Sequence, residues 1–357
     1  MPSSSSHGAG TDRPSLVRSR TFAGAFAPEQ IVSVEGAVWV VGSTEHGREE
    51  TCTVGPVDPA TLAVSLVHAA SSCPYVAAGP GHLYLTAVTY LGASNDEAIR
   101  IASVDVATDR ASVLTPVVMT VGGSAIAHIA LTYGAGFLWL YGFASPSSGT
   151  PVVLRISPVT GTVVATITGV PAIGGGQPAL AVDAAGGVWL AGGAGGTASL
   201  ERVAPGSSTP VPVLLDPAPV SILWLSAVGD TVWAQAATFG PGNSASTRLV
   251  ALATTGQPIT EGQAEQLGDG PLAGSARALW SIGSSHCPTV AVESYAEPLY
   301  RIDPATGDAV VATTLRSPVN LCDVGPGSFV AVAGRWVFVL APSDSASRPS
   351  TLFRVSS

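Results

Sequence analysis

The sequence contains no lysine, and this absence removes several kinds of chemistry. All 15 basic residues are arginines, against 24 acidic residues, so the formal net charge is −9. Without lysine the chain can form no Schiff base and has no lysine to act as a general base. An acidic chain without basic clusters also lacks the positive surface that binds a phosphate backbone, so we expect no nucleic-acid partner.

Long apolar runs are missing as well. No uninterrupted apolar stretch approaches the roughly 18 to 20 residues that span a bilayer, so we expect no transmembrane segment. Residues 1–14 are rich in Ser, Gly and Pro and lack the apolar region of a signal peptide. We expect them to be a disordered linker, such as would follow an anchor or leader. Residues 15–357 are expected to form a single, monomeric domain.

The chain does contain a repeat, which occurs seven times. Each copy has a short apolar segment, a tight turn and a second apolar segment that carries an aromatic residue. Successive aromatics lie 44 to 58 residues apart, close to the roughly 40 to 50 residues of a four-stranded repeat unit. The aromatics are Trp39, Tyr84, Trp139, Trp189, Trp233, Trp280 and Phe338.

Third and fourth strands follow each pair of segments, but the seventh copy ends with STLFRVSS (350–357) and has no fourth strand. The segment LVRSRTFAG (16–24), ahead of the first copy, alternates like a strand and can fill this place. We therefore predict an all-β fold, a seven-bladed β-propeller of four-stranded antiparallel blades. The N-terminal strand should close the ring by pairing with the C-terminal strand, as the outer strand of the last blade, which leaves no open edge.

Two recurrent residue types have structural roles in this prediction. Asp58, Asp105 and Asp303 stand in turns such as Asp-Pro-Ala-Thr-Gly, where an Asp side chain accepts hydrogen bonds from the amides of its own turn. We interpret them as turn formers in preference to metal ligands. The seven aromatics are interpreted as packing between blades in preference to a platform that stacks a ligand.

The four cysteines occupy equivalent places in two blades. Cys52 lies between the second and third strands of blade 1 and Cys73 in the link to blade 2, and Cys287 and Cys322 have the same two places in blade 6. Both kinds of connection emerge on one face, so we predict disulfides between Cys52 and Cys73 and between Cys287 and Cys322. The alternative is two pairs of reduced buried thiols. Disulfides would place the protein outside the cytoplasm, extracellular or at the cell surface.

Four segments carry a resemblance to known proteins: GPGHLYL (79–85), GAGFLWL (134–140), VVLRISPVTGTVVATI (152–167) and LYRIDPATGDAVVAT (299–313). Through them nearly the whole chain resembles the bacterial YVTN-type, quinoprotein-like and streptogramin-lyase-like propellers. The resemblance implies the fold, because these motifs are the strands and turns that all such propellers share. Streptogramin lyases use magnesium with a Glu and a His one residue apart, and this chain has no Glu-x-His.

No other enzymatic motif is present. The chain has no G-x-S-x-G, P-loop or HExxH, and its predicted innermost strands offer little charge for a quinone or calcium. His128 is the one good histidine candidate for the channel, and a structural role is favoured for it. We expect no catalytic residue, no metal site and no cofactor. The alternative is a streptogramin-lyase-like or other metal-assisted enzyme that acts at the channel mouth.

Long polar loops are concentrated in blades 5, 6, 7 and 1, which adjoin one another. Loops held by a rigid scaffold are where recognition residues gather. We therefore predict a non-catalytic, extracytoplasmic protein that binds a protein, peptide or glycan through the loop face of this arc. The opposing interpretation is that these loops are merely solvated. The candidate binding residues are Glu45, His46, Arg48, Glu49, His286, Glu293, Tyr295, Arg316 and Asn320.

Overall fold

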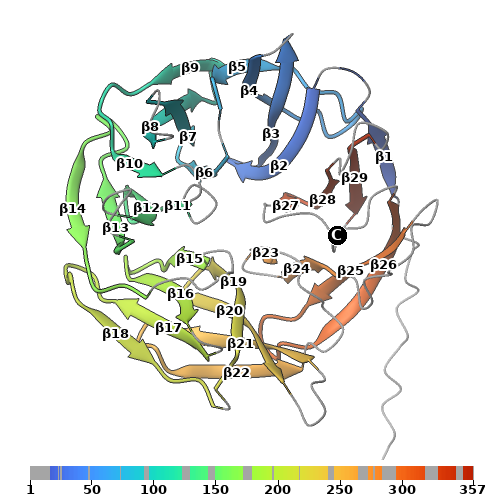
Figure 1. Ribbon diagram of the computed structural model, residues 1–357. Helices are drawn as coiled ribbons and strands as arrows, with labels where there is room; N and C mark the ends of the chain where they lie inside the picture. Colours follow the sequence, from blue (N-terminus) through green and yellow to red (C-terminus); the bar gives the residue numbers. More distant parts are fainter. Residues whose placement is uncertain are drawn as a thin grey trace, which may run out of the picture.

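A computed structural model shows seven antiparallel sheets arranged as a ring around a central axis (Figure 1). For some residues within strands, the structure describes the backbone and not the side chain. The described residues are 17–22, 24, 26–46, 49–72, 74–91, 96–122, 129–143, 149–171, 179–194, 197–216, 218–239, 245–263, 272–275, 278–283, 295–317, 329–342 and 349–356.

Each blade runs from an inner strand near the axis to an outer strand at the rim (Figure 1). Blades 1 to 4 comprise β2 (Phe26–Val34), β3 (Ala37–His46), β4 (Glu49–Pro56) and β5 (Val67–Ala70); β6 (Val76–Gly79), β7 (His82–Tyr90), β8 (Asp96–Asp105), β9 (Arg110–Val113) and β10 (Met119–Gly122); β11 (Ala130–Gly134), β12 (Phe137–Phe143), β13 (Pro151–Ile156) and β14 (Val163–Ile167); and β15 (Ala179–Val182), β16 (Val188–Ala194), β17 (Thr197–Val203) and β18 (Pro210–Val213). Blades 5 to 7 comprise β19 (Ser221–Val228), β20 (Thr231–Phe239), β21 (Ala245–Ala253) and β22 (Pro258–Gln263); β23 (Leu272–Ser275), β24 (Ala278–Ile282), β25 (Tyr295–Ile302) and β26 (Ala309–Ser317); and β27 (Val330–Ala333), β28 (Trp336–Ala341), β29 (Thr351–Ser356) and β1 (Arg18–Thr21).

The predicted ring closure is confirmed. β1 pairs antiparallel with β29, from Arg18 opposite Arg354 to Thr21 opposite Thr351, and the sheet order is β1-β29-β28-β27. The two ends of the chain therefore share one blade, in which β1 is the outer strand (Figure 1). All four residues of β1 are exposed, so backbone pairing contributes more to this closure than side-chain burial does.

The predicted packing between blades is confirmed too. Each of the seven second-strand aromatics is at most 6% exposed and lies in a separate apolar cluster, and each cluster joins its blade to the following one. Trp139, for example, packs with Val182, Val188 and Val203 of blade 4. Truncating a buried aromatic of this size typically costs about 3–5 kcal/mol. The second strand thus holds neighbouring blades together.

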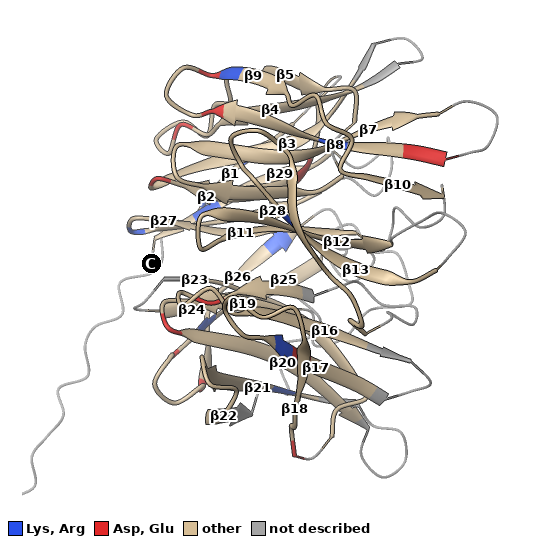
Figure 2. Ribbon diagram, turned by 90° about the vertical axis from the view of Figure 1, so that its left-hand side faces the viewer, with Lys and Arg blue, Asp and Glu red and all other residues tan. Residues whose placement is uncertain are grey.

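The aspartates in the turns behave as predicted. The Oδ1 atom of Asp58 accepts hydrogen bonds from the amides of Ala60 (2.7 Å) and Thr61 (3.3 Å). The same atom of Asp105 accepts from two amides at 2.9 and 3.0 Å, and that of Asp303 accepts from the Ala305 amide at 2.8 Å. Figure 2 shows several acidic residues in turns at one face of the ring and few charges along the strands.

Blade 2 differs from a regular four-stranded blade at its outer edge. The outer edge of blade 2 is divided, since β9 and β10 both pair with β8. Pro116 lies in the break and has no N–H to donate, although Leu114 and Val118 on either side still donate to Ile101 and Ile99.

Among the residues described, no helix is long and apolar enough to cross a membrane.

Candidate functional site: a cavity between blades 3 and 4

The structure describes only part of the binding arc predicted from the sequence. Arg48, His286, Glu293 and Asn320 lie outside the described residues, as does His128. Of the remaining arc residues, only Tyr295 and Arg316 have described side chains.

The candidate residues Glu45, His46 and Glu49 were predicted to lie on a loop, and this was wrong. β3 runs to His46 and β4 starts at Glu49, so Glu45 and His46 pair with Glu50 and Glu49 in an extended hairpin. Alternation of polar and apolar residues is weak here, which concealed the strands.

Tyr295 and Arg316 also lie in strands, at the start of β25 and near the end of β26. Tyr295 is 7% exposed, whereas Arg316 is exposed. Of these two, Arg316 is the side chain that a partner can reach. The binding role of the arc stays a prediction.

The cysteine pairings also stay predictions. Cys52 lies on β4 opposite Ala70, is 2% exposed and is not a free thiol. Its predicted partner Cys73 lies outside the described residues, as do Cys287 and Cys322.

A different site emerges from the third strands, where an arginine lies opposite the second-strand aromatic in four blades. The pairs are Trp139 with Arg155, Trp189 with Arg202, Trp280 with Arg301, and Phe338 with Arg354. Because residues opposite one another on a sheet share a face, these arginines lie on the side that packs toward the next blade. Three of them have described ring contacts: Arg155, Arg202 and Arg354.

In blade 4 the arginine is paired with a carboxylate. Asp183 follows β15, its side chain is fully buried, and its Oδ2 lies 3.5 Å from Nη2 of Arg202. The same carboxylate accepts hydrogen bonds from the amide of Gly187 (2.7 Å) and from Nε1 of Trp189 (2.9 Å). Asp183 therefore satisfies three donors at once, and the charge of Arg202 is balanced within its own blade.

In blade 3 the corresponding carboxylate is absent. Gly134 takes the place of Asp183, because both residues stand opposite the position two before the tryptophan. Nε1 of Trp139 donates instead to the backbone oxygen of Gly134, at 3.1 Å. A side chain cannot replace this glycine, since a Cβ atom there would lie 2.4 Å from Cβ of Val182.

Arg155 rests on aromatic rings in place of a carboxylate. Its Cζ lies 4.6 Å from the ring centroid of Phe137 and 6.0 Å from that of Trp139. Within the described part of the chain, the side chain of Arg155 has no hydrogen bond or ion pair. Its Nε is buried and unpaired, although the Nε atoms of Arg202 and Arg354 are as well. Arg155 therefore differs from Arg202 in that it has no described anionic partner.

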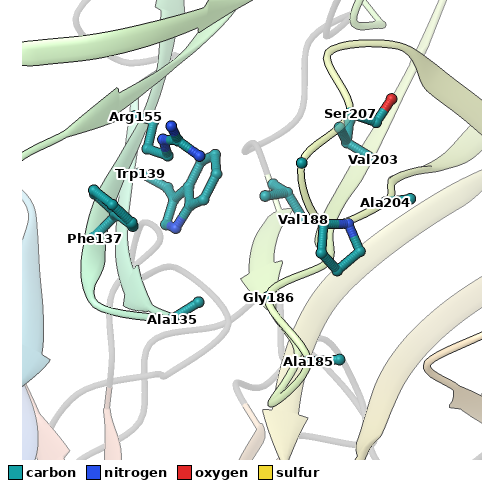
Figure 3. Close-up of a pocket in the computed structure, with 12 residues that line it drawn as sticks. Ala135, Phe137, Trp139, Arg155, Ala185, Gly186, Val188, Val203, Ala204 and Ser207 are labelled. Atoms are coloured by element: carbon teal, nitrogen blue, oxygen red, sulfur yellow. The ribbon is translucent and has the colours of Figure 1, made fainter.

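Arg155 lines a cavity between blades 3 and 4 (Figure 3). Phe137, Trp139 and Arg155 form one wall, and Val188 and the turn of residues 204–207 form the opposite wall. The cavity volume is about 130 Å³. This is small beside the roughly 300–1,000 Å³ of sites that enclose a drug-sized ligand. The cavity thus fits one functional group of a larger molecule.

The side chains that line the cavity can contact an anionic group. An arginine presents a planar fork of donors that matches a carboxylate, and flanking rings shield that contact from water. Ser207 supplies the one side-chain hydroxyl among the described lining residues. No group of three or more His, Cys, Asp or Glu side chains that could hold a metal occurs among the residues described.

The sequence contained a signal for this site that the motif search missed. The third strands of blades 3, 4, 6 and 7 read LRI, ERV, YRI and FRV, so the arginine recurs at one position. The difference between Gly134 and Asp183 is the informative part, and it emerges only when the two hairpins are aligned by register. The hairpin of blade 4 is one residue longer, which hides the equivalence.

Comparison with known proteins supports the fold alone. A scan of protein-family models finds no match, and a search of curated proteins finds no relative. Solved structures do match. The β-propeller domain of the Trilobed protease from Pyrococcus furiosus aligns with a TM-score of 0.57, at 10% identity over 94% of each chain.

Two further structures show the same likeness. Kuenenia stuttgartiensis hydrazine synthase aligns with a TM-score of 0.55, at 11% identity over 98% of each chain. Pyrococcus horikoshii acylaminoacyl peptidase has a TM-score of 0.55 at 9% identity, and the alignment covers 93% of this chain and 51% of the peptidase. The chain therefore spans about half the length of that enzyme. The fold is that of a seven-bladed β-propeller.

Proposed function

We propose that this protein is a non-catalytic binding propeller that holds a carboxylate group of a protein or peptide partner at Arg155. The observation that carries the proposal is the contrast between two equivalent arginines. Arg202 has Asp183 as its internal counterion, whereas Arg155 faces a cavity and has only aromatic rings beside it. A carboxylate supplied by a partner would complete in blade 3 the arrangement that blade 4 completes by itself.

The size of the cavity selects the kind of ligand. A volume of about 130 Å³ admits an acidic side chain or a C-terminal carboxylate, and is too small to enclose a cofactor. The rest of the partner would lie on the exposed turn of residues 204–207.

We also propose that the protein works outside the cytoplasm. The support is the even number of cysteines, their equivalent positions in blades 1 and 6, and the absence of a free thiol at Cys52. A rigid ring with covalent ties suits a binding role there, because a preformed site loses little entropy on binding.

Saturation-transfer NMR with phenylacetate and its uncharged amide, phenylacetamide, tests the carboxylate site. We expect phenylacetate to bind and phenylacetamide not to bind. Arg155→Gln should remove phenylacetate binding, because the charge-assisted hydrogen bonds are lost. Ala204→Asp should remove it as well, because a carboxylate on the opposite wall would become the counterion; Ala204 is exposed, so the substitution leaves the core intact.

The matched control is Arg110→Gln, which removes an exposed arginine on β9 of blade 2. Its phenylacetate binding should equal that of the wild type. If Arg155→Gln binds phenylacetate as the wild type does, the ligand is held elsewhere and the proposed site is wrong. Equal binding of the acid and the amide would show that the cavity recognises the ring and not the charge.

A further inference from the structure

Arg354 is a cation that is almost fully enclosed where the ring closes. It lies on β29 and is 4% exposed, and its Cζ lies 4.2 Å from the ring centroid of Trp336. Within the described residues its side chain has no hydrogen bond or ion pair, and its Nε is buried without a partner. A buried cation is costly unless an anion accompanies it.

Two further arginines lie around it. Arg335 approaches the same Trp336 ring, with 4.7 Å between Cζ and the centroid. Arg18 of β1 is the register partner of Arg354, and like charges directly opposite on neighbouring strands are destabilising. Burial is the main cause that lowers the pKa of Arg354, and the charges of Arg18 and Arg335 lower it further. Three positive charges therefore converge on one end of blade 7.

The described carboxylates do not balance this charge. Asp58 of blade 1 is the acid whose charge favours the protonated form of Arg354, but no ion pair joins the two residues. The Asp58 carboxylate is already bound to the amides of its own turn. Arg18 meets the same turn through a neutral acceptor, since its Nη1 donates to the oxygen of Ala60 at 3.0 Å.

We propose that a dianionic oxyanion, a phosphate or sulfate group, binds among Arg18, Arg335 and Arg354 and fastens the N-terminal strand to the ring. Planar guanidinium groups match the oxygens of such an anion. An anion with two negative charges also neutralises more of the charge of three arginines than a single carboxylate does. Arg18 lies on β1, Arg335 lies in the turn between β27 and β28, and Arg354 lies on β29. The anion would therefore join the N-terminal strand to the C-terminal part of the chain. This site is independent of the Arg155 cavity.

Calorimetric titration of the full chain with inorganic phosphate at constant ionic strength tests the proposal. The exposed arginines are the informative ones to change, because Arg18→Gln and Arg335→Gln leave the core intact. We expect each to weaken phosphate binding by at least about tenfold, since a lost charge-assisted hydrogen bond has an effect of this order. Arg110→Gln and Arg155→Gln should bind phosphate like the wild type, which separates this site from the carboxylate cavity.

Thermal unfolding supplies a second readout. Phosphate should raise the melting temperature of the wild type more than that of Arg18→Gln or Arg335→Gln, because a ligand stabilises only a state that binds it. The general stabilisation by phosphate as a salt is common to all variants and cancels in the comparison. Equal affinity and equal melting shifts in the wild type and both variants would overturn the proposal, as would no phosphate binding by the wild type. If the wild type binds phosphate and both variants bind it more weakly, titration with phenyl phosphate distinguishes an open site, which accepts a monoester, from a site for the free ion.

Discussion

Arg155 and Arg202 occupy the same register position in adjacent blades, each opposite a buried tryptophan, yet only Arg202 has a carboxylate within ion-pair distance among the described residues. The two blades therefore share the register of the arginine and the tryptophan, and they differ in whether the blade supplies a counterion. Blade 4 satisfies its arginine internally, and blade 3 leaves it beside a cavity. One residue of the hairpin, Gly134 in place of Asp183, separates the internal ion pair of blade 4 from the carboxylate site that we propose in blade 3.

Asp183 should be important for stability. Replacing it by alanine leaves Arg202, Gly187 and Trp189 without their acceptor, and breaking such a buried pair costs on the order of 3 kcal/mol. Asp303→Ala is the matched control, because Asp303 is exposed and accepts one described amide hydrogen bond; its loss should cost about 1 kcal/mol or less. Urea unfolding measures both values. Equal costs would show that the Asp183 network is not a stabilising unit.

Glu97 should make the stability depend on pH. It is 3% exposed, and desolvation raises its pKa above the ordinary value, opposed by a hydrogen bond from Tyr90. Because the pKa of Glu97 is raised in the folded state, its contribution to the free energy of unfolding is fully present below the unfolded pKa. This contribution is lost as the pH rises through the folded pKa. Glu97→Gln should therefore stabilise the protein more at pH 7.5 than at pH 4. Urea unfolding at the two pH values measures the effect, and a pH-independent effect of Glu97→Gln would contradict the prediction.

Removal of β1 should open the ring. Deleting residues 1–14 should leave the melting temperature almost unchanged, because β1 starts at Arg18. Deleting residues 1–25 removes β1 and exposes the edge of β29, so the melting temperature should fall by many degrees or the chain should fail to fold. Differential scanning calorimetry compares the two truncations. Equal melting temperatures would mean that strand pairing at the seam adds little stability.

The two predicted disulfides can be detected by mass spectrometry. Mass spectrometry of non-reduced digests, after expression in an oxidising compartment, should find Cys52 joined to Cys73 and Cys287 joined to Cys322. We do not expect cross-pairing between blades 1 and 6, since blade 7 separates these blades and bridged Cα atoms lie within about 7 Å. Four free thiols in protein from its natural compartment would refute the pairing and remove the support for export.

The arc of blades 5, 6, 7 and 1 can be tested for a partner separately from the cavity. Glu45, His46, His286 and Arg316 changed together to alanine should abolish capture of a partner that depends on the arc and barely alter the melting temperature, since surface changes cost within about 0.5 kcal/mol. Tyr295 is left in place because it is buried. Changes in segments 145–150 and 192–197 of blades 3 and 4 are the control. If the control set loses the partner and the arc set keeps it, the functional face lies on the other side of the ring.

Much of the fold could be predicted from local sequence. Seven copies of one strand pattern, an aromatic in each second strand and a missing fourth strand sufficed for the blade number, the packing and the closure. These features could be recognised because each depends on neighbours in the chain or on one face of one strand. The turn aspartates could be predicted for the same reason, since their hydrogen bonds reach only two or three residues along the chain.

The charge balance around each arginine could not be predicted this way. Whether Arg155, Arg202 or Arg354 has a counterion depends on a hairpin across the sheet and on a turn in the next blade, so it is decided by register and by packing between blades. The ends of β3 and β4, which include Glu45, His46 and Glu49, could not be predicted either, because these strands pair although their sequence is polar. The sequence by itself determined how many blades form and how the ring closes. The tertiary structure decided which charges are left for a ligand, because electrostatic interactions act through space and not along the chain.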